Sequence, residues 1–243
     1  MMNPRSSVLH VLSALTAALA AACFLLAGCE PDSQPTASLT APPFPPDAQT
    51  ETRAAAGEVE AQVEVGRWHL GGAGQPRDYK AAAQWLAKAG QGGSAEAQYL
   101  MGTLCEAGGG VEQSATNALK WFQLAAAQQH AGALYNLGSM YAAGRGVPQD
   151  STRAARLFLE AAELGDALAQ FNVAQRFELG RGVSTNLVES WKWYSLAASG
   201  GVADAQQALP SVERRLSAEE IRAARRAVAD FQRHALSLKR TAQ

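Results

Sequence analysis

The chain has 243 residues and a formal net charge of −1; 47% of its residues are hydrophobic and only 7% are aromatic. This balance excludes a disordered protein and a protein that lies wholly inside a membrane, and the near-zero charge gives no overall attraction to nucleic acid. Alanine dominates the composition. Because alanine has the highest helix propensity and a small side chain, the sequence predicts an all-α protein of closely packed helices.

Residues 1–28 are predicted to be a signal peptide. Arg5 precedes an apolar run from Val8 to Leu26, and the run ends in the tetrapeptide LAGC. This tetrapeptide resembles the lipobox of bacterial lipoproteins. The resemblance implies that Cys29 becomes the mature N-terminus and carries acyl chains, which anchor a protein stably when two or more are present. A plain signal peptide and an anchor helix are the alternatives.

The residue after this cysteine favours the outer membrane. The best-known signal that retains such lipoproteins in the inner membrane is an aspartate at this position, and this chain has Glu30. The resemblance thus implies a lipid-anchored protein that faces the periplasm, with the inner membrane as the alternative location. Cys23 would leave with the signal peptide and Cys29 would be acylated, so only Cys105 remains and no intramolecular disulfide can form.

Residues 29–56 are predicted to be a lipidated, disordered tether. Prolines are dense in the first part of this segment and favour an extended, semi-rigid backbone. They are Pro31, Pro35, Pro42, Pro43, Pro45 and Pro46. The stretch PPFPP could also be a ligand for a proline-recognition domain, but a spacer that lifts the folded part off the membrane is the favoured interpretation.

From Gly57 onward the sequence repeats itself every 36 residues. We call residues that hold the same place in successive repeats a column. Four columns keep this spacing without an insertion: Gly66, Gly102, Gly138 and Ala174; Gly72, Gly108, Gly144 and Gly180; Gly74, Gly110, Gly146 and Gly182; Trp85, Trp121, Leu157 and Trp193. We divide the array into four repeats, at residues 57–92, 93–128, 129–164 and 165–201.

Each repeat is predicted to contain two helices joined by a Gly-x-Gly turn. Apolar residues recur at helical spacing on both sides of this turn. A residue that favours the N-cap position precedes each second helix, namely Asp78, Ser114, Asp150 and Asn186. The glycine in the middle of three first helices costs about 1 kcal/mol relative to alanine. We attribute it to close approach of the second helix, with the tryptophan column filling the space nearby.

The third repeat, AGALYNLGSMYAAGRGVPQDSTRAARLFLEAAELGD at residues 131–166, closely resembles the Sel-one-like repeat (SLR) family, a relative of the tetratricopeptide repeat. The resemblance covers the four repeats. It implies a right-handed α/α solenoid of four helix pairs, and a role as an adaptor or scaffold for other proteins.

Residues 202–243 are predicted to be a degenerate half-repeat followed by a capping helix. The segment SAEE at residues 217–220 is a capping box, and apolar residues from Ile221 to Ala235 keep helical spacing. Such a helix covers the exposed apolar face of a last repeat. Its opposite face is basic, which is typical of a solvated helix surface, although binding to anionic lipid or glycan is the alternative.

The sequence predicts no catalytic residue, no metal site and no cofactor. The histidines are scattered rather than spaced as metal ligands. Cys105 is predicted to be a buried thiol and His69 a packed first-helix residue, because both share a column with Tyr141 and Phe177. Nucleophile motifs of hydrolases are absent.

Related solenoids bind peptides on the concave surface formed by their first helices, where polar side chains hydrogen-bond an extended backbone. The best candidates for such contacts are Asn136, Ser139, Asn172, Gln175 and Arg176. We therefore expect a membrane-anchored periplasmic adaptor whose partner is an envelope protein or peptide, and no nucleic acid. The alternative is an envelope enzyme or binder that acts on peptidoglycan or β-lactams.

Overall fold

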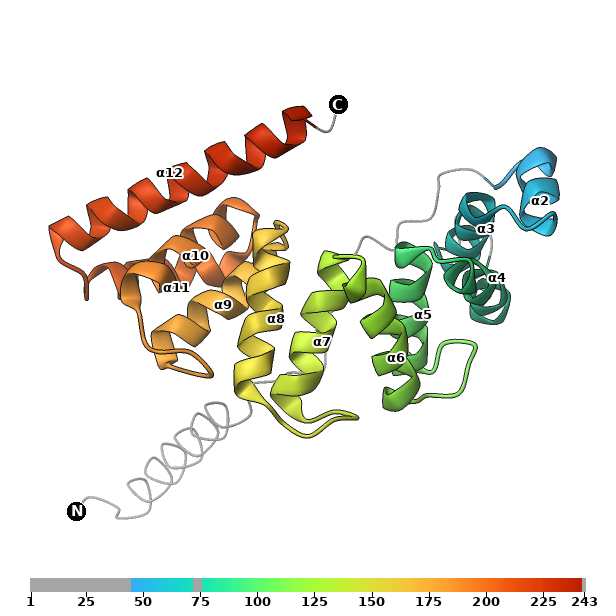
Figure 1. Cartoon of the computed structure of the whole chain (residues 1–243), viewed down its shortest axis with the longest axis horizontal. Coiled ribbons are helices and arrows are strands. Elements are labelled where there is room, and N and C mark those ends of the chain that lie inside the picture. The colour runs from blue at the N-terminus through green and yellow to red at the C-terminus, as the bar shows by residue number, and fades with distance from the viewer. Residues whose placement is uncertain (1–44, 72–75, 242–243) are drawn as a thin grey trace, which may run out of the picture. The chain divides into compact units, whose positions relative to one another are not determined.

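The computed structural model describes residues 45–71 and 76–241, which form eleven α-helices and no strand (Figure 1). Cys29, the predicted signal peptide and most of the tether lie outside the described residues, as do Gly72 and Gly74. The helices are α2 (Ala48–Ala55), α3 (Val59–Gly71), α4 (Tyr79–Gln91), α5 (Ala95–Ala107), α6 (Ala115–Ala127), α7 (Ala131–Ala143), α8 (Ser151–Glu163), α9 (Ala167–Leu179), α10 (Leu187–Ser199), α11 (Ala203–Glu213) and α12 (Ala218–Thr241).

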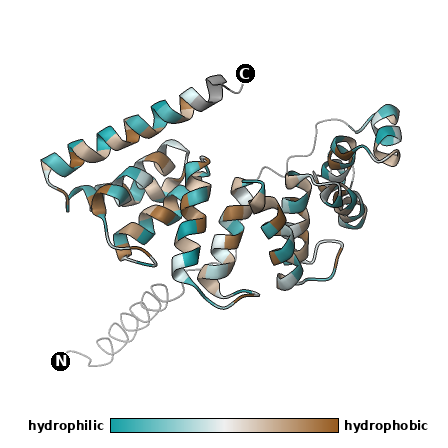
Figure 2. Ribbon diagram, viewed as in Figure 1, coloured by the Kyte–Doolittle hydropathy of each residue, from teal (hydrophilic) through white to brown (hydrophobic). Residues whose placement is uncertain are grey.

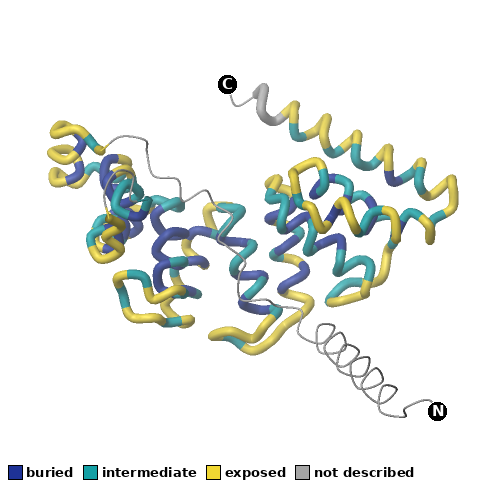
Figure 3. The backbone as a smooth tube through the Cα atoms, turned by 180° about the vertical axis from the view of Figure 1, so that it is seen from behind, coloured by how far each residue is buried: buried dark blue, intermediate teal, exposed yellow. Residues whose placement is uncertain are grey.

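Eight helices of equal length, α3 to α10, form four consecutive pairs. Each of these helices has 13 residues, and every helix from α2 to α10 packs against the next one along the chain. The buried residues form two large clusters, and both clusters include side chains of α7. Figure 3 shows the buried segments, in dark blue, on facing sides of neighbouring helices. The predicted all-α solenoid is confirmed.

Glycines in the first helices allow close approach of the second helices. A Cβ atom on Gly102 would lie 2.5 Å from Cδ1 of Phe122, and one on Gly138 would lie 3.0 Å from Cδ1 of Phe158. Both distances are shorter than ordinary van der Waals contact. Close approach of the two helices therefore explains the glycine. The expectation that the tryptophan column fills the space beside it was wrong, because the contacting residues, Phe122 and Phe158, each follow a member of that column by one position.

Trp121, a member of the tryptophan column, instead contacts the preceding repeat. A Cβ on Gly90, near the end of α4, would lie 3.0 Å from Cζ3 of Trp121 on α6. Successive residues of a helix point about 100° apart, so Trp121 and Phe122 must face different neighbours. Phe122 faces the helix of its own pair, and Trp121 faces the repeat before it.

The Gly-x-Gly turns have two separate structural roles. The first glycine ends the first helix in a left-handed conformation; Gly144, with φ of 69°, donates its N–H to the Met140 carbonyl. The second glycine lies against the start of the preceding repeat's second helix, since a Cβ on Gly146 would be 3.0 Å from Cβ of Ala115. The pair therefore both reverses the chain and allows one repeat to pack on the next.

Side-chain caps begin the helices at matching positions. Before the second helices, Asp78, Ser114, Asp150 and Asn186 each accept a hydrogen bond from a backbone N–H inside the first turn. The first helices have a second series of caps, which the sequence analysis did not find: Ser94, His130 and Asp166. Helix start sites are therefore fixed twice in the second, third and fourth repeats.

In three of the four repeats, a buried glutamine ties the first helix to the helix before it. The Nε2 atoms of Gln62, Gln98 and Gln170 donate to backbone carbonyls at the end of the preceding helix, over 3.1, 2.9 and 3.2 Å respectively. All three side chains are buried. The place of this glutamine in the third repeat is taken by Leu134, which is also buried. These three glutamines therefore join successive helices through hydrogen bonds that are shielded from water.

The predicted disordered tether was wrong over residues 48–55, which form α2. Asp47 caps this helix by accepting the N–H of Thr50, and the side chains of Thr50 and Ala54 are buried. Gln62 on α3 donates to the carbonyl of Ala54. A short helix such as this is marginal alone but is stabilised by packing, and α2 covers α3 as a second helix would cover the next repeat.

The C-terminal segment forms α11 and α12, and both pack against α10. The predicted capping box is present: Ser217 N–H donates to Glu220 Oε2 over 2.8 Å, and Glu220 N–H donates to Ser217 Oγ. Phe231 meets the ring of Trp193 edge to face at 5.4 Å. The ribbon of α12 alternates between hydrophilic and hydrophobic positions, as an amphipathic capping helix does (Figure 2).

Within residues 45–71 and 76–241, none of the helices combines the length and the apolar character of a membrane-spanning segment.

Candidate functional site

The five predicted contact residues lie on two first helices, one repeat apart. Asn136 and Ser139 belong to α7, and Asn172, Gln175 and Arg176 belong to α9. All five are partly buried. Asn136 and Asn172 hold the same place in their repeats, as do Ser139 and Gln175. The two helices thus present amides or hydroxyls at matching positions, separated by one repeat.

Three of these side chains are available to a ligand. Among the described residues, Asn136, Ser139 and Gln175 have no hydrogen-bond partner. Asn172 donates from Nδ2 to the Leu168 carbonyl over 3.0 Å, which leaves its Oδ1 as an acceptor. Amide and hydroxyl groups of this kind can pair with the N–H and C=O groups of an extended peptide.

Arg176 differs from these residues, because its side chain is held both by α8 of the preceding repeat and by the turn of its own repeat. The guanidinium carbon lies 4.8 Å from the ring centre of Phe158, and Nη1 donates to the Arg181 carbonyl over 3.2 Å. The Nε atom is buried without a partner. Burial, followed by the nearby charge of Arg181, lowers the pKa of Arg176 below its usual value.

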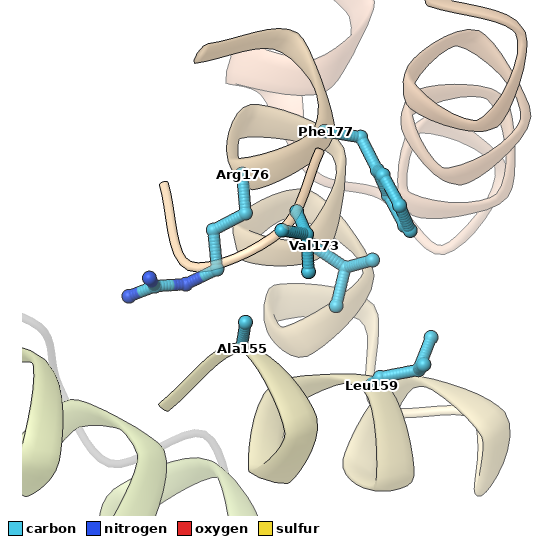
Figure 4. Close-up of a pocket in the computed structure, with 6 residues that line it drawn as sticks. Ala155, Leu159, Val173, Arg176 and Phe177 are labelled. Carbon is cyan, nitrogen blue, oxygen red and sulfur yellow. The ribbon is translucent and has the colours of Figure 1, made fainter. Parts of the chain in front are cut away.

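A small pocket adjoins Arg176 (Figure 4). Ala155 and Leu159 of α8, Val173 and Phe177 of α9, and Val183 of the following turn complete its lining. Apart from Arg176, the sequence analysis did not identify these residues as part of a site. The alignment of the repeats could have indicated this site. Arg176 holds the place that Met140 holds in the preceding repeat, and the Met140 side chain is fully buried.

A second polar cluster joins the first three repeats. His130 caps α7 by accepting the Ala133 N–H at Nδ1, and its Nε2 lies 3.1 Å from Oε2 of Glu96 on α5. Arg67 of α3 lies 3.5 Å from the other carboxylate oxygen. The hydrogen bond from His130 holds the pKa of Glu96 below its usual range, although burial opposes this shift. Every polar group here is used in packing repeats together, so the cluster is structural.

Cys105 is buried on α5, and burial raises the pKa of its thiol. A buried thiol that resists ionisation is a poor nucleophile. In the described part of the chain, no group of three His, Cys, Asp or Glu side chains is arranged to hold a metal ion. The polar side chains at matching positions on α7 and α9 are therefore the strongest candidates for a site, and they are suited to binding.

Comparisons with known proteins agree with this architecture. The family model of the Sel1 repeat matches residues 59–94, 95–130, 131–166 and 167–202. Each match begins at the first residue of a first helix, two residues after the boundary predicted from the glycine spacing. A comparison with curated proteins finds no match.

Two solved structures are similar to this chain. A protective antigen of uropathogenic Escherichia coli that displays an SLR fold is 27% identical over 75% of this chain, with a TM-score of 0.69. This chain covers only 39% of that antigen's length. A Sel1 repeat protein from Oxalobacter formigenes is 30% identical, with a TM-score of 0.60 and 66% of each chain covered. Because the four repeat matches cover more than half of the chain, it belongs to the Sel1 repeat family, whose members in general mediate protein–protein interactions.

Proposed function

We propose that this protein is an adaptor of the bacterial envelope that binds another protein or peptide along its first helices and performs no chemistry. The observation that supports this proposal most directly is the set of polar side chains without partners on α7 and α9. Asn136, Ser139 and Gln175 are satisfied by no other described residue, and their spacing follows the repeat. A partly exposed amide or hydroxyl that is not paired inside the protein can exchange its water for a hydrogen bond to a ligand.

Capture of envelope proteins on the immobilised protein tests this function. The variant Asn136→Ala with Asn172→Ala removes both amides of the shared column. The matched control is Asn117→Ala, which removes an exposed amide from α6. We expect a discrete protein that the wild type and the control retain and the double variant loses. An identical set of retained proteins in all three samples would contradict the proposed surface.

The adaptor is further proposed to be anchored by lipid at Cys29 and to face the periplasm, from the outer membrane rather than the inner one. The support is the LAGC tetrapeptide at the end of the apolar N-terminal run, together with Glu30. Cys29→Ala is expected to abolish metabolic labelling with a palmitate analogue, while Cys105→Ala leaves labelling unchanged. Labelling that survives Cys29→Ala would overturn the anchor.

Direct recognition of peptidoglycan is the competing function. The observation that favours it is the exposed basic face of α12, formed by Arg222, Arg225, Arg226 and Arg233. Purified sacculi, stripped of proteins, discriminate between the two functions. The adaptor proposal predicts that the protein stays in the supernatant unless envelope proteins are added. Sedimentation with bare sacculi would favour the glycan binder.

A further inference from the structure

The terminal helix α12 carries a row of arginines on the side that faces away from the array. Arg222, Arg226 and Arg233 are four and seven residues apart, so they follow one side of the helix, and all three are exposed. Phe231 packs into the core from the opposite side, because it follows Arg222 by about two and a half helical turns. In both views α12 lies at the margin of the molecule, with no described helix beyond it (Figure 1, Figure 3).

The charge of this row is not neutralised inside the protein. The guanidinium groups of Arg222 and Arg226 form no ion pair or hydrogen bond with any described residue. Arg233 pairs with Asp230 on its own helix, where both side chains are largely exposed, so this pair contributes little. Six basic residues outnumber three acidic residues in α12. The outer side of the helix is therefore cationic and available to an anionic ligand.

A large apolar side chain lies beside the arginines. Leu236 follows Arg233 by three residues, which places it on the same side of the helix, and it is 59% exposed. An exposed leucine among arginines suits a bilayer surface, where an apolar layer begins just below charged headgroups. The glycan of the cell wall offers no such layer. Leu236 therefore favours lipid over peptidoglycan as the ligand of this side of α12.

We propose that the outer side of α12 binds the surface of an anionic phospholipid bilayer. The arginines pair with headgroup phosphates, and Leu236 enters the upper part of the acyl layer. Arginine suits this role because its planar group donates two parallel hydrogen bonds to one phosphate. Each basic residue near an anionic surface adds to binding, and salt screens the attraction. The contact is therefore peripheral, reversible and weakened by salt.

This inference goes beyond the adaptor proposal, because it adds a second surface with a different kind of partner. It also complements the proposed acyl anchor. An anchor at Cys29 alone would leave the array free at the end of its tether, whereas contact through α12 would hold the array against the membrane. A vesicle assay requires neither the protein partner nor the acyl chain, so each proposal can fail without the others.

Sedimentation with lipid vesicles tests this surface. The chain from residue 30 onward is used, because it lacks the cysteine proposed to be acylated and keeps every described helix and both large buried clusters. In low salt we expect it to bind vesicles of phosphatidylglycerol and phosphatidylcholine at least about tenfold more tightly than vesicles of phosphatidylcholine alone. Bare sacculi should leave it in the supernatant. Equal binding to both kinds of vesicle, binding to neither, or sedimentation with sacculi alone would overturn the proposal.

A triple variant tests the arginine row. It combines Arg222→Gln, Arg226→Gln and Arg233→Gln and is expected to bind anionic vesicles at least about tenfold more weakly than the wild type. The matched control replaces by glutamine three other exposed arginines that form no ion pair with described residues: Arg153, Arg156 and Arg181. The control removes the same charge and should bind nearly as the wild type does. Equal weakening of both variants, or undiminished binding by the first, would overturn the proposal.

Leu236→Ala tests the apolar part of the contact. This variant is expected to bind anionic vesicles at least about threefold more weakly, because less apolar surface enters the acyl layer. The matched control is Leu124→Ala, which shortens a similarly exposed leucine on α6 and should bind as the wild type does. Undiminished binding by Leu236→Ala would overturn the assignment to lipid.

Discussion

Gln129 follows α6 in a left-handed backbone conformation, with φ of 59°. Glycine holds the same place after α2, α4, α8 and α10, as Gly57, Gly93, Gly165 and Gly201. A side chain in this conformation brings Cβ close to the carbonyl oxygen and costs about 1–2 kcal/mol. The turn between the second and third repeats therefore contains local strain that the other turns avoid.

Gln129→Gly is predicted to raise the free energy of unfolding by about 1 kcal/mol, because glycine adopts this conformation without strain. Urea unfolding followed by circular dichroism measures the change. Ala127→Gly provides the control, since it adds the same flexibility at the last residue of α6, where no left-handed conformation is relieved, and it should not raise stability. A loss of stability in Gln129→Gly would show that the turn is not strained.

The pKa of Glu96 makes a contribution to stability that depends on pH. The pKa is lowered from its ordinary value of 4.5, with the hydrogen bond from His130 as the largest cause. A carboxyl group whose pKa is lower in the folded state stabilises that state when ionised. The stabilisation by Glu96 is therefore complete at pH values above the ordinary pKa, and it is lost as the pH falls through the pKa of the folded state.

Glu96→Gln is accordingly predicted to be less stable than the wild type at about pH 7, with a difference that shrinks at about pH 3. Urea unfolding at both values of pH measures it. Glu60→Gln is the matched control, because Glu60 holds the same place on α3 and makes no ion pair with the described residues. A difference between Glu96→Gln and the wild type that is constant with pH would contradict this interpretation of the cluster.

At the scale of the helix pair, the glycine in the first helix determines how closely two helices pack. Gly102→Ala improves the helix propensity of α5, yet its Cβ would lie 2.5 Å from the Phe122 ring. The overpacking is predicted to dominate and to lower the free energy of unfolding by about 1–3 kcal/mol. Thermal and urea unfolding both report this.

The fourth repeat supplies the comparison, because it has Ala174 at this place, fully buried. Ala174→Gly lowers the helix propensity of α9 and relieves no steric overlap, so it is expected to lower the free energy of unfolding by about 1 kcal/mol. If Gly102→Ala instead stabilised the protein, close approach would not be the reason for the glycine.

The helices could be predicted from sequence because their signals are local. Each N-cap residue acts on the turn that follows it, so Asp150 and Asn186 indicate helix starts without knowledge of any neighbour. By contrast, α2 has only eight residues beside a proline-rich stretch, and it is stabilised mainly by its contact with α3. The neighbour of Gly102 was misassigned because it depends on the rotation of one helix against another.

The candidate site could be predicted only in part, for a related reason. Asn136 and Asn172 share a column and are therefore visible in the sequence. The pocket arises from Ala155 and Arg176, which belong to different repeats and meet only across the gap between α8 and α9. Arg176 was identified as a polar contact, and its burial follows from its alignment with Met140 rather than from its own chemistry.

At the scale of the whole array, each repeat packs mainly on its neighbours, so surfaces on successive first helices form by repetition. A partner that binds one first helix therefore meets chemically similar groups one repeat further along. This is the physical basis of the adaptor proposal, and it predicts that a single partner contacts both α7 and α9.

In-cell photocrosslinking tests this claim most directly. A photoreactive residue is placed in turn at Asn136 and Asn172, and for comparison at Leu124 and Glu160, which are exposed on the second helices α6 and α8. Mass spectrometry then identifies the crosslinked protein. The adaptor proposal predicts one envelope protein captured from both first-helix positions and from neither second-helix position. Capture from the second helices alone, with none from the first helices, would contradict it.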